Sequence, residues 1–434
     1  MSHSDKNKIG IWTTTSLVVG NMIASGVFML PATLAVYGGI SLIGWLISGA
    51  GALCLALVYC WLSKLRPNAV GGPYAYTRDG MGEFAGFLVA WGYWISVWCT
   101  NAAIAVGFVS YLTIFIPALG SNPFLSVGTG LSAIWFLTWI NTKGIKEAGI
   151  VQVITTILKI VPLLVITIGG LFYLNMDHFI PFNVSSESNL SVITSATTLT
   201  LFAFLGLESA TIPSGNIKDP EKTIPRATIM GTLITTAIYF LGTVAVMGLI
   251  PPAELHLSQA PFADAAASIW GEWARYLVAG GAVISTFGAL NGWILIQGQM
   301  PYAAARDKIF PAVFAKESKN GTPIMGIIIS SVLISILMSM NFTRSLADTF
   351  TFMILLTTLT VLLPYLFSII SLVMLEHKQK SLTSFKLIIS ILAFIYSMWA
   401  IIGSGEEIVY WGFILLMAGL PFYAWVQMKR KTTS

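Results

Sequence analysis

Charged residues are scarce in this sequence: Asp, Glu, Lys and Arg make up only 9% of its 434 residues. A soluble domain of ordinary composition carries about 25%. This scarcity argues against a conventional soluble enzyme. The net charge of +5 arises from bases in short connections rather than from one basic patch, so we expect no nucleic-acid partner.

The signatures of metal, nucleotide and nucleophile chemistry are missing as well. The sequence has only three Cys residues, and Cys54, Cys60 and Cys99 fall in apolar segments without metal-ligand spacing. We therefore expect free buried thiols. The run GGPYAY at residues 71–76 lacks the Lys-Ser/Thr ending of a phosphate-binding loop, and its turn residues instead predict a short loop helix. We expect no enzyme activity, no cofactor and no metal site.

Long apolar runs, in contrast, are abundant. Hydrophobic residues make up 56% of the chain, and the mean hydropathy is +0.81. Apolar runs of about 18–25 residues cross the hydrocarbon core of a bilayer as α-helices. We predict an all-α integral membrane protein that forms one transmembrane domain over residues 1–434. The twelve predicted spans are residues 9–36, 40–62, 83–113, 124–142, 147–174, 193–215, 225–250, 275–305, 324–341, 346–375, 384–402 and 408–428.

The basic residues predict the orientation of the spans. All but three of the 23 Lys and Arg residues lie at the termini or in alternate connections between the predicted spans. The connections on the opposite side keep only Arg275 and Arg344, and Lys159 falls within the fifth span. Because cytoplasmic loops carry the excess of Lys and Arg, both termini are predicted to be cytoplasmic.

Two of the spans are interrupted by small residues at corresponding places. The first span contains GNMIASGVF (20–28), and the sixth contains FAFLGLES (202–209). A pair of glycine-interrupted spans in matching halves points to the substrate site of a transporter. The half-helix ends would offer N–H groups to a carboxylate and C=O groups to an ammonium, and an amino acid carries both. The alternative is that the small residues only allow close helix packing.

One carboxylate stands beside the second interruption. Glu208 follows Gly206 in an otherwise apolar run, and an ionisable group at membrane depth is costly unless it is paired or hydrated. A gating or proton-linked role is one interpretation, and a structural ion pair with Lys159 is the other. Lys159 itself either fills an ion site as a structural cation or titrates during transport.

Motifs along essentially the whole chain resemble the amino acid–polyamine–organocation superfamily, and within it the basic amino acid/polyamine antiporters. The bacterial arginine/agmatine exchangers are the most similar group, and the putrescine/ornithine and cadaverine/lysine exchangers are near relatives. The motifs are GNMIASGVFMLPATLAVYGG (20–39), GGPYAYTRDGMGEFAGF (71–87), FAFLGLESA (202–210), DPEKTIPRAT (219–228), APFADAA (260–266) and LLPYLFS (362–368).

The resemblance implies a LeuT-like fold with discontinuous first and sixth helices. Two inverted repeats of five helices would occupy residues 9–174 and 193–375, and two additional helices would occupy residues 384–428. Such proteins often form homodimers through their last spans.

The resemblance also implies a substrate site. Residues 23–26 match the unwound first helix that holds the substrate carboxylate, and the carbonyl groups around Ala203 match the break that takes its amino group. Asn101 matches a position near a guanidinium or amine head, although an interhelical hydrogen bond is a serious alternative. Trp293 and Phe202 match pocket aromatics, with ordinary core packing as the alternative. The full substrate-binding set is Ile23, Ala24, Ser25, Gly26, Ser96, Val97, Asn101, Phe202, Ala203, Leu205, Trp293 and Thr357.

A gate is implied on the cytoplasmic side of this site. Tyr93, Glu208 and Tyr365 match residues that link closure to proton-dependent turnover. Two positions differ from the basic exchangers. Phe202 stands where a tryptophan stacks over the substrate's aliphatic chain, and a phenyl ring stacks more weakly. Lys159, a gating or proton-linked candidate, stands where those exchangers carry an apolar residue and many broader permeases carry a lysine.

These observations predict a secondary transporter of a bacterial inner membrane. It would exchange an external basic amino acid (arginine, ornithine or lysine) for an intracellular decarboxylation product (agmatine, putrescine or cadaverine) by alternating access. Its partners would be these small molecules and the lipid bilayer. Two alternatives stay open: a proton-coupled or exchange permease for other amino acids, neutral ones included, and a receptor that binds an amino acid without moving it.

Overall fold

The computed structural model describes residues 10–67, 69, 71–143, 160–211, 214, 217–318, 322–341 and 343–432. These residues form α-helices, short 3-10 helices and turns, and no strand occurs among them. Ten helical segments of the described part are long and apolar enough to cross a membrane. The prediction of an all-helical membrane protein is therefore confirmed at this level.

The ten segments correspond to ten of the predicted spans. They are α1 and α2 (Ile11–Met22 and Ser25–Ala35), η2 and α3 (Gly38–Ile40 and Ser41–Leu65), α5 (Glu83–Leu112), α7 (Pro123–Lys143), α9 with η4 and η5 (Asn189–Leu201, Phe202–Phe204 and Ser209–Thr211), α10 (Pro220–Leu249), α13 (Glu272–Arg306), α15 (Leu346–Lys378), α16 (Ser384–Ile402), and α17 with α18 (Glu406–Met417 and Gly419–Thr432).

The other two predicted spans are shorter in the described residues. Of the fifth span, 147–174, the helix Ile160–Gly170 is described, whereas residues 144–159 lie outside the described part. The ninth corresponds to α14 (Ile324–Met340), which has 17 residues. Twelve membrane crossings and the inverted repeat therefore stay predictions. The remaining elements are α4 (Pro73–Met81), α6 (Ala118–Ser121), η3 (Met176–Phe179), α11 (Pro252–Leu255), α12 (Pro261–Trp270) and η7 (Ala312–Ala315).

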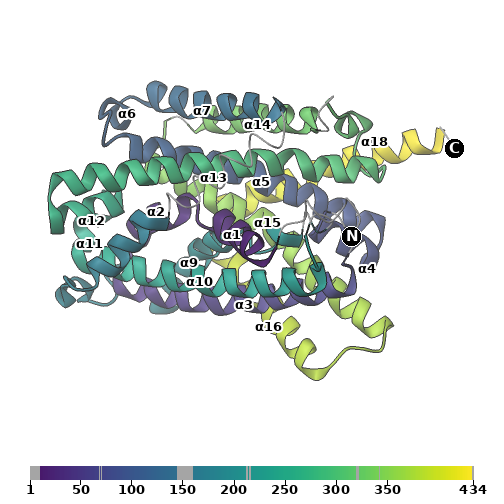
Figure 1. The fold of residues 1–434 in the computed structure, drawn as a ribbon, viewed down its shortest axis with the longest axis horizontal. Coiled ribbons are helices and arrows are strands. Elements are labelled where there is room, and N and C mark those ends of the chain that lie inside the picture. Colours follow the sequence, from purple (N-terminus) through teal and green to yellow (C-terminus); the bar gives the residue numbers. More distant parts are fainter. Residues whose placement is uncertain are drawn as a thin grey trace.

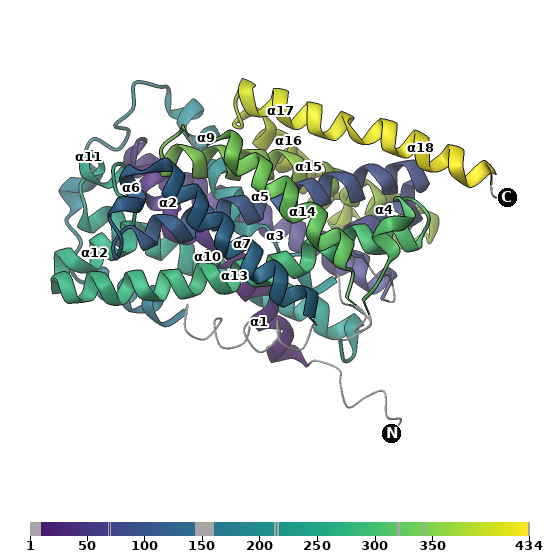
Figure 2. The same ribbon diagram turned by 90° about the horizontal axis from the view of Figure 1, so that it is seen from above.

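The long helices run side by side along the long axis of the molecule (Figure 1). α11 and α12 lie at one end of this axis, and α4 and the last turns of α18 lie at the other, as the turned view in Figure 2 also shows. We call these the α12 end and the α4 end. In the bundle α5 packs along both α13 and α15, and α3 packs along α9 and α10.

The helix interruptions lie where the small residues predict them. α1 ends at Met22, and the backbone of Ile23 (ψ 85°) and Ala24 (ψ −141°) leaves the helical region before α2 begins. α9 ends at Leu201 and continues as a single 3-10 turn. Gly206 then adopts a φ of +98°, a conformation that L side chains rarely take.

The two interruptions pack against each other. A Cβ built on Gly26 would lie 3.3 Å from a ring carbon of Phe202, and one on Gly206 would lie 3.2 Å from Cβ of Asn21 and 3.3 Å from the ring of Trp293. Each break thus has a glycine whose missing side chain makes room for the other break. The backbones of the two discontinuous helices therefore approach each other closely at the breaks. A site built from helix ends requires this arrangement.

Candidate functional site

The α1–α2 break has one capped and one open end. At the end of α1, Trp293 Nε1 donates to the carbonyl of Asn21 at 3.2 Å, and Tyr239 Oη donates to the carbonyl of Met22 at 2.5 Å. The start of α2 has no side-chain cap, and the buried Ser25 hydroxyl has no hydrogen-bond partner within the described residues. Uncapped N–H groups at a helix start form an anion-binding end. This end suits a carboxylate.

In the sixth-helix break, backbone hydrogen bonds that span three residues replace the four-residue bonds of an α-helix. The N–H of Leu205 donates to the carbonyl of Phe202 at 3.1 Å, and the N–H of Leu207 donates to the carbonyl of Phe204 at 3.3 Å. The N–H of Ser209 then donates to the carbonyl of Gly206 at 2.9 Å. Leu205 has an extended backbone (ψ 136°) and Gly206 a φ of +98°, so the helical run of α9 is interrupted here, as a site built from a helix break requires.

Two aromatic side chains cover the breaks. Phe202 is buried between Gly26 of α2 and Phe350 of α15, whose ring meets it edge-on at a centroid distance of 6.1 Å. Trp293 of α13 is 3% exposed and is held by its bond to α1. Both predicted pocket aromatics thus lie at the breaks, where a ring face can cover a methylene chain or a cation.

The candidates on α5 and α15 differ in how their polar atoms are used. Ser96 Oγ donates to the carbonyl of Tyr93 at 2.8 Å within its own helix. Asn101 Nδ2 donates to Gln297 Oε1 of α13 at 2.7 Å, so the interhelical bond considered from the sequence is present. Asn101 Oδ1 and the Thr357 hydroxyl are buried without a partner in the described residues. Val97, one turn before Asn101, is fully buried.

Tyr93, Glu208 and Tyr365 are brought together as one hydrogen-bonded group. Tyr93 Oη donates to Glu208 Oε1 at 2.8 Å, and Tyr365 Oη donates to Glu208 Oε2 at 3.0 Å. The Glu208 side chain has no solvent exposure. Tyr59 of α3, which the sequence did not single out, packs its ring edge-on against Tyr365 at 5.9 Å. Each carboxylate oxygen therefore has a neutral hydroxyl donor.

The ion pair considered between Glu208 and Lys159 falls partly outside the described residues, because Lys159 lies there. Within the part of the chain that the structure describes, Glu208 takes part in no salt bridge. Among these residues, the carboxylate accepts hydrogen bonds from the hydroxyls of Tyr93 and Tyr365.

At the α4 end a second polar group ties the predicted loop helix to α13. Tyr74 Oη donates to Asp307 Oδ2 at 2.8 Å, Arg78 Nη1 donates to Tyr74 Oη at 3.1 Å, and Arg78 forms an ion pair with Asp307. Burial, followed by the hydrogen bond to Asp307, raises the pKa of Tyr74 above its ordinary value. The phenol therefore stays protonated and remains a donor at neutral pH.

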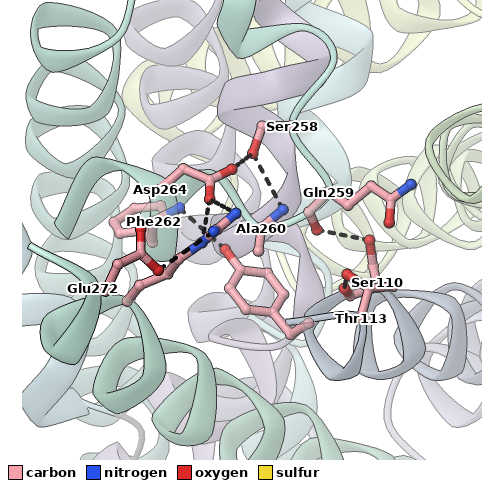
Figure 3. A network of polar contacts seen from close by, with 10 residues as sticks. Ser110, Thr113, Ser258, Gln259, Ala260, Phe262, Asp264 and Glu272 are labelled. Atoms are coloured by element: carbon pink, nitrogen blue, oxygen red, sulfur yellow. Dashed lines mark hydrogen bonds and ion pairs between the residues drawn. The ribbon is translucent and has the colours of Figure 1, made fainter. Parts of the chain in front are cut away.

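At the α12 end a third polar group surrounds Phe262 and Asp264 of α12 (Figure 3). Tyr111 of α5 donates to the carbonyl of Phe28 at 2.9 Å and accepts from the N–H of Phe262 at 3.2 Å, so it joins α2 to α12. The side chain of Asp264 on α12 accepts from Arg275 of α13 and from Ser258. These contacts hold α12 over the bundle.

The predicted site residues that the structure describes lie inside the bundle. All predicted site residues within the described part are buried. The clefts of about 460 and 190 Å³ near His178 and near Arg344 are lined by other residues. The arrangement is a pair of helix breaks enclosed by aromatic rings, with hydrogen-bonded groups toward each end of the bundle.

Comparison with known proteins identifies the family of the chain. A family model for amino acid permeases matches residues 9–428. The chain belongs to the amino acid permease family. The resemblance to the amino acid–polyamine–organocation superfamily that the motifs carry is thereby confirmed.

Relatives of this permease match it over nearly its whole length. It is 34% identical to a Bacillus subtilis protein named "Putative arginine/ornithine antiporter" (97% of each chain covered). It is 32% identical to the cadaverine/lysine antiporter of Escherichia coli K12 (99% of this permease and 98% of the relative covered). It is 30% identical to the arginine/ornithine antiporter of Pseudomonas aeruginosa (98% and 92% covered). The individual roles assigned to site residues stay predictions.

Proposed function

We propose that this permease is an antiporter that exchanges an external basic amino acid for an intracellular amine by alternating access. The observation that carries the proposal is the close packing of two helix breaks around Gly26 and Gly206. The names of the relatives support exchange of basic substrates: two pair arginine with ornithine, a second amino acid, and one pairs lysine with the amine cadaverine. The family argues against an enzyme.

The substrate backbone would lie between the breaks. Its carboxylate would meet the uncapped N–H groups at the start of α2, and its ammonium would meet carbonyl groups of the segment 202–206. The aliphatic chain would run beside Phe202 and Trp293 toward Asn101 and Thr357, whose buried side-chain oxygen atoms have no partner among the described residues. In the proposed movement, alternating access involves two inverted repeats, residues 9–174 and 193–375. The last two helices follow these repeats in the chain.

We place the α4 end in the cytoplasm of a bacterial cell. Arg66, Arg78, Arg306 and Lys378 lie in or beside the connections at this end, and the positive-inside rule favours that side for them. On this placement the hydrogen-bonded group of Tyr93, Glu208 and Tyr365 closes the cytoplasmic side of the site. A change in the protonation of Glu208 would alter its bonds to the two hydroxyls and thereby couple opening to pH.

The test is counter-transport into proteoliposomes that contain the purified full-length protein. Vesicles loaded with agmatine, putrescine or cadaverine should take up labelled arginine, ornithine or lysine, and empty vesicles should take up little. If empty vesicles take up substrate in response to a pH gradient, the mechanism is proton-coupled transport and not exchange. Absence of uptake for all three basic amino acids, with binding of a neutral amino acid, would overturn the choice of substrate.

A further inference from the structure

Gln297 is a polar residue in the second half of α13, and the resemblance assigns it no role. It lies one helical turn beyond Trp293, so the two side chains share a face of the helix. Gln297, Asn101 and Ser331 are all fully buried. Burial of a primary amide at this depth destabilises the folded protein unless all the hydrogen bonds of the amide are made.

The hydrogen bonds of Gln297 determine which way its amide points. An amide NH₂ group has two hydrogens to donate, and its carbonyl oxygen only accepts. Gln297 Nε2 donates to the carbonyl of Ile327 at 3.1 Å and to Ser331 Oγ at 3.0 Å, both on α14. A flipped amide would place its oxygen against the Ile327 carbonyl, which cannot donate. Gln297 therefore presents Oε1, an acceptor, to α5.

This orientation dictates the orientation of Asn101. Only Nδ2 of Asn101 can donate to Gln297 Oε1, and the two atoms are 2.7 Å apart. The carbonyl oxygen of Asn101 then points away from Gln297. It is buried and has no partner within the described residues. An unpaired buried carbonyl oxygen costs about 1–3 kcal/mol, a cost that a donor from a ligand removes.

We propose that Gln297 is a positioning residue that sets the substrate class by holding the carbonyl oxygen of Asn101 toward the substrate head. The inference rests on the proposed function and sharpens it. A head group that only donates hydrogen bonds, an ammonium or a guanidinium, satisfies this oxygen. A head group that presents an acceptor there leaves two acceptors face to face, and a purely apolar head leaves the oxygen unpaired.

The test compares arginine with citrulline, which replaces one guanidinium nitrogen by a carbonyl oxygen at nearly the same shape. Each competes against exchange of the labelled basic amino acid that the wild-type protein carries. Gln297→Met keeps the side-chain length and removes the amide. The side-chain amide of Asn101 is then free to rotate and exchange the positions of its oxygen and nitrogen. We expect the preference for arginine over citrulline to fall by about tenfold, the change that one lost hydrogen bond of about 1.4 kcal/mol produces.

Gln297→Glu is the conservative variant. A neutral carboxylic acid can donate to the Ile327 carbonyl and still accept from Asn101, and an ionised one would add attraction for a cation. Gln297→Glu should therefore retain at least about half of the wild-type preference in either protonation state. Asn141→Ala is the matched control, because it removes another buried interhelical amide bond to α13, from Asn141 Nδ2 to Asn291 Oδ1 at 2.9 Å. It should leave the ratio of the two inhibition constants unchanged.

The outcomes are separable. Retention of the preference in Gln297→Met, or equal loss in Gln297→Glu and Gln297→Met, would overturn the positioning role. If Gln297→Met does not fold, Gln297→Glu alone decides, since its loss of the preference contradicts the inference. A wild-type protein that exchanges no basic amino acid overturns the proposed function. Arginine and citrulline would then compete for binding of whichever labelled amino acid the purified protein binds, and a shift of that preference in Gln297→Met would still support the orientation of Asn101.

Discussion

Two tyrosines on α5 face the two ends of the site, and their partners are of different kinds. Tyr93 donates to the buried carboxylate of Glu208, whereas Tyr111 donates to a backbone carbonyl, that of Phe28. They lie about five helical turns apart, roughly 27 Å along the axis. We call the group of Tyr93, Glu208 and Tyr365 the α4-side gate, and the group of Tyr111, Phe28, Phe262, Asp264 and Arg275 the α12-side closure.

The α4-side gate and the α12-side closure differ in burial and in charge. Glu208 has no solvent exposure, and both its oxygens depend on tyrosine hydroxyls. The ion pair of Asp264 with Arg275 is 2.9 Å long, but the two side chains are 25% and 36% exposed. A half-exposed pair contributes about 0–1 kcal/mol and is screened by salt. The α4-side gate should therefore respond to protons, and the α12-side closure should respond weakly to ionic strength.

The largest effect is expected from Glu208→Ala. It leaves the hydroxyls of Tyr93 and Tyr365 buried without an acceptor, at a cost of about 1–3 kcal/mol each. We expect the exchange rate to fall by about tenfold or more. Glu208→Gln should retain part of the rate and lose the pH dependence, because an amide does not titrate in this range. Initial exchange rates from acidic to neutral pH measure both effects.

Glu376→Gln is the control for this prediction. Glu376 is also buried, but it pairs with Lys386 at 2.6 Å near the end of α15 and lies outside the gate. Its substitution should leave the shape of the pH profile unchanged. A wild-type pH profile in Glu208→Gln would mean that the carboxylate only supports the structure.

Gly206→Ala should have the next largest effect. The φ of +98° strains any L side chain, and the added Cβ would press on Asn21 and Trp293 of the facing break. Such a conformation costs about 1–3 kcal/mol. Gly82→Ala is a matched control, since Gly82 has a φ of +92° with no atom within 4 Å of the added Cβ.

Both glycine variants are measured by thermal stability and by substrate affinity in the same membranes. Each should lose stability from backbone strain, but only Gly206→Ala should also lose affinity, by about tenfold. Equal affinity losses would show that strain alone, and not the packing of the two breaks, governs the site.

The breaks were predictable from the sequence because two small-residue interruptions fall at corresponding places in the two halves, whereas a single one is equally well explained by close helix packing. The contact of Tyr93 and Tyr365 with Glu208 was expected only from the family resemblance, since residues so far apart in the chain have no shared local pattern. Gln297 was missed although it carries a signal, an amide side chain inside a long apolar span.

Other features left no sequence signal. Tyr111 bonds to the backbone atoms of Phe28 and Phe262, and backbone partners can belong to any residue type. The start of the seventh span was placed at 225, but α10 begins at Pro220. Pro220 is tolerated there because the first helical position needs no N–H. Pro225 then lies inside the helix, so hydropathy alone set the boundary too late.

The smallest effect is expected at the α12-side closure, from Asp264→Asn. The amide still accepts from Ser258, and Arg275 keeps Glu272 as a partner at 3.6 Å. We expect the exchange rate to change by less than about fivefold at low salt, the range of a partly exposed pair, and to match the wild type at high salt. Exchange measured at two ionic strengths, with Glu272→Gln as the control, tests this. A loss as large and as salt-independent as that of Glu208→Ala would show that the two ends are closed with equal strength, and the contrast between a proton-sensitive gate and a weakly held cover would be wrong.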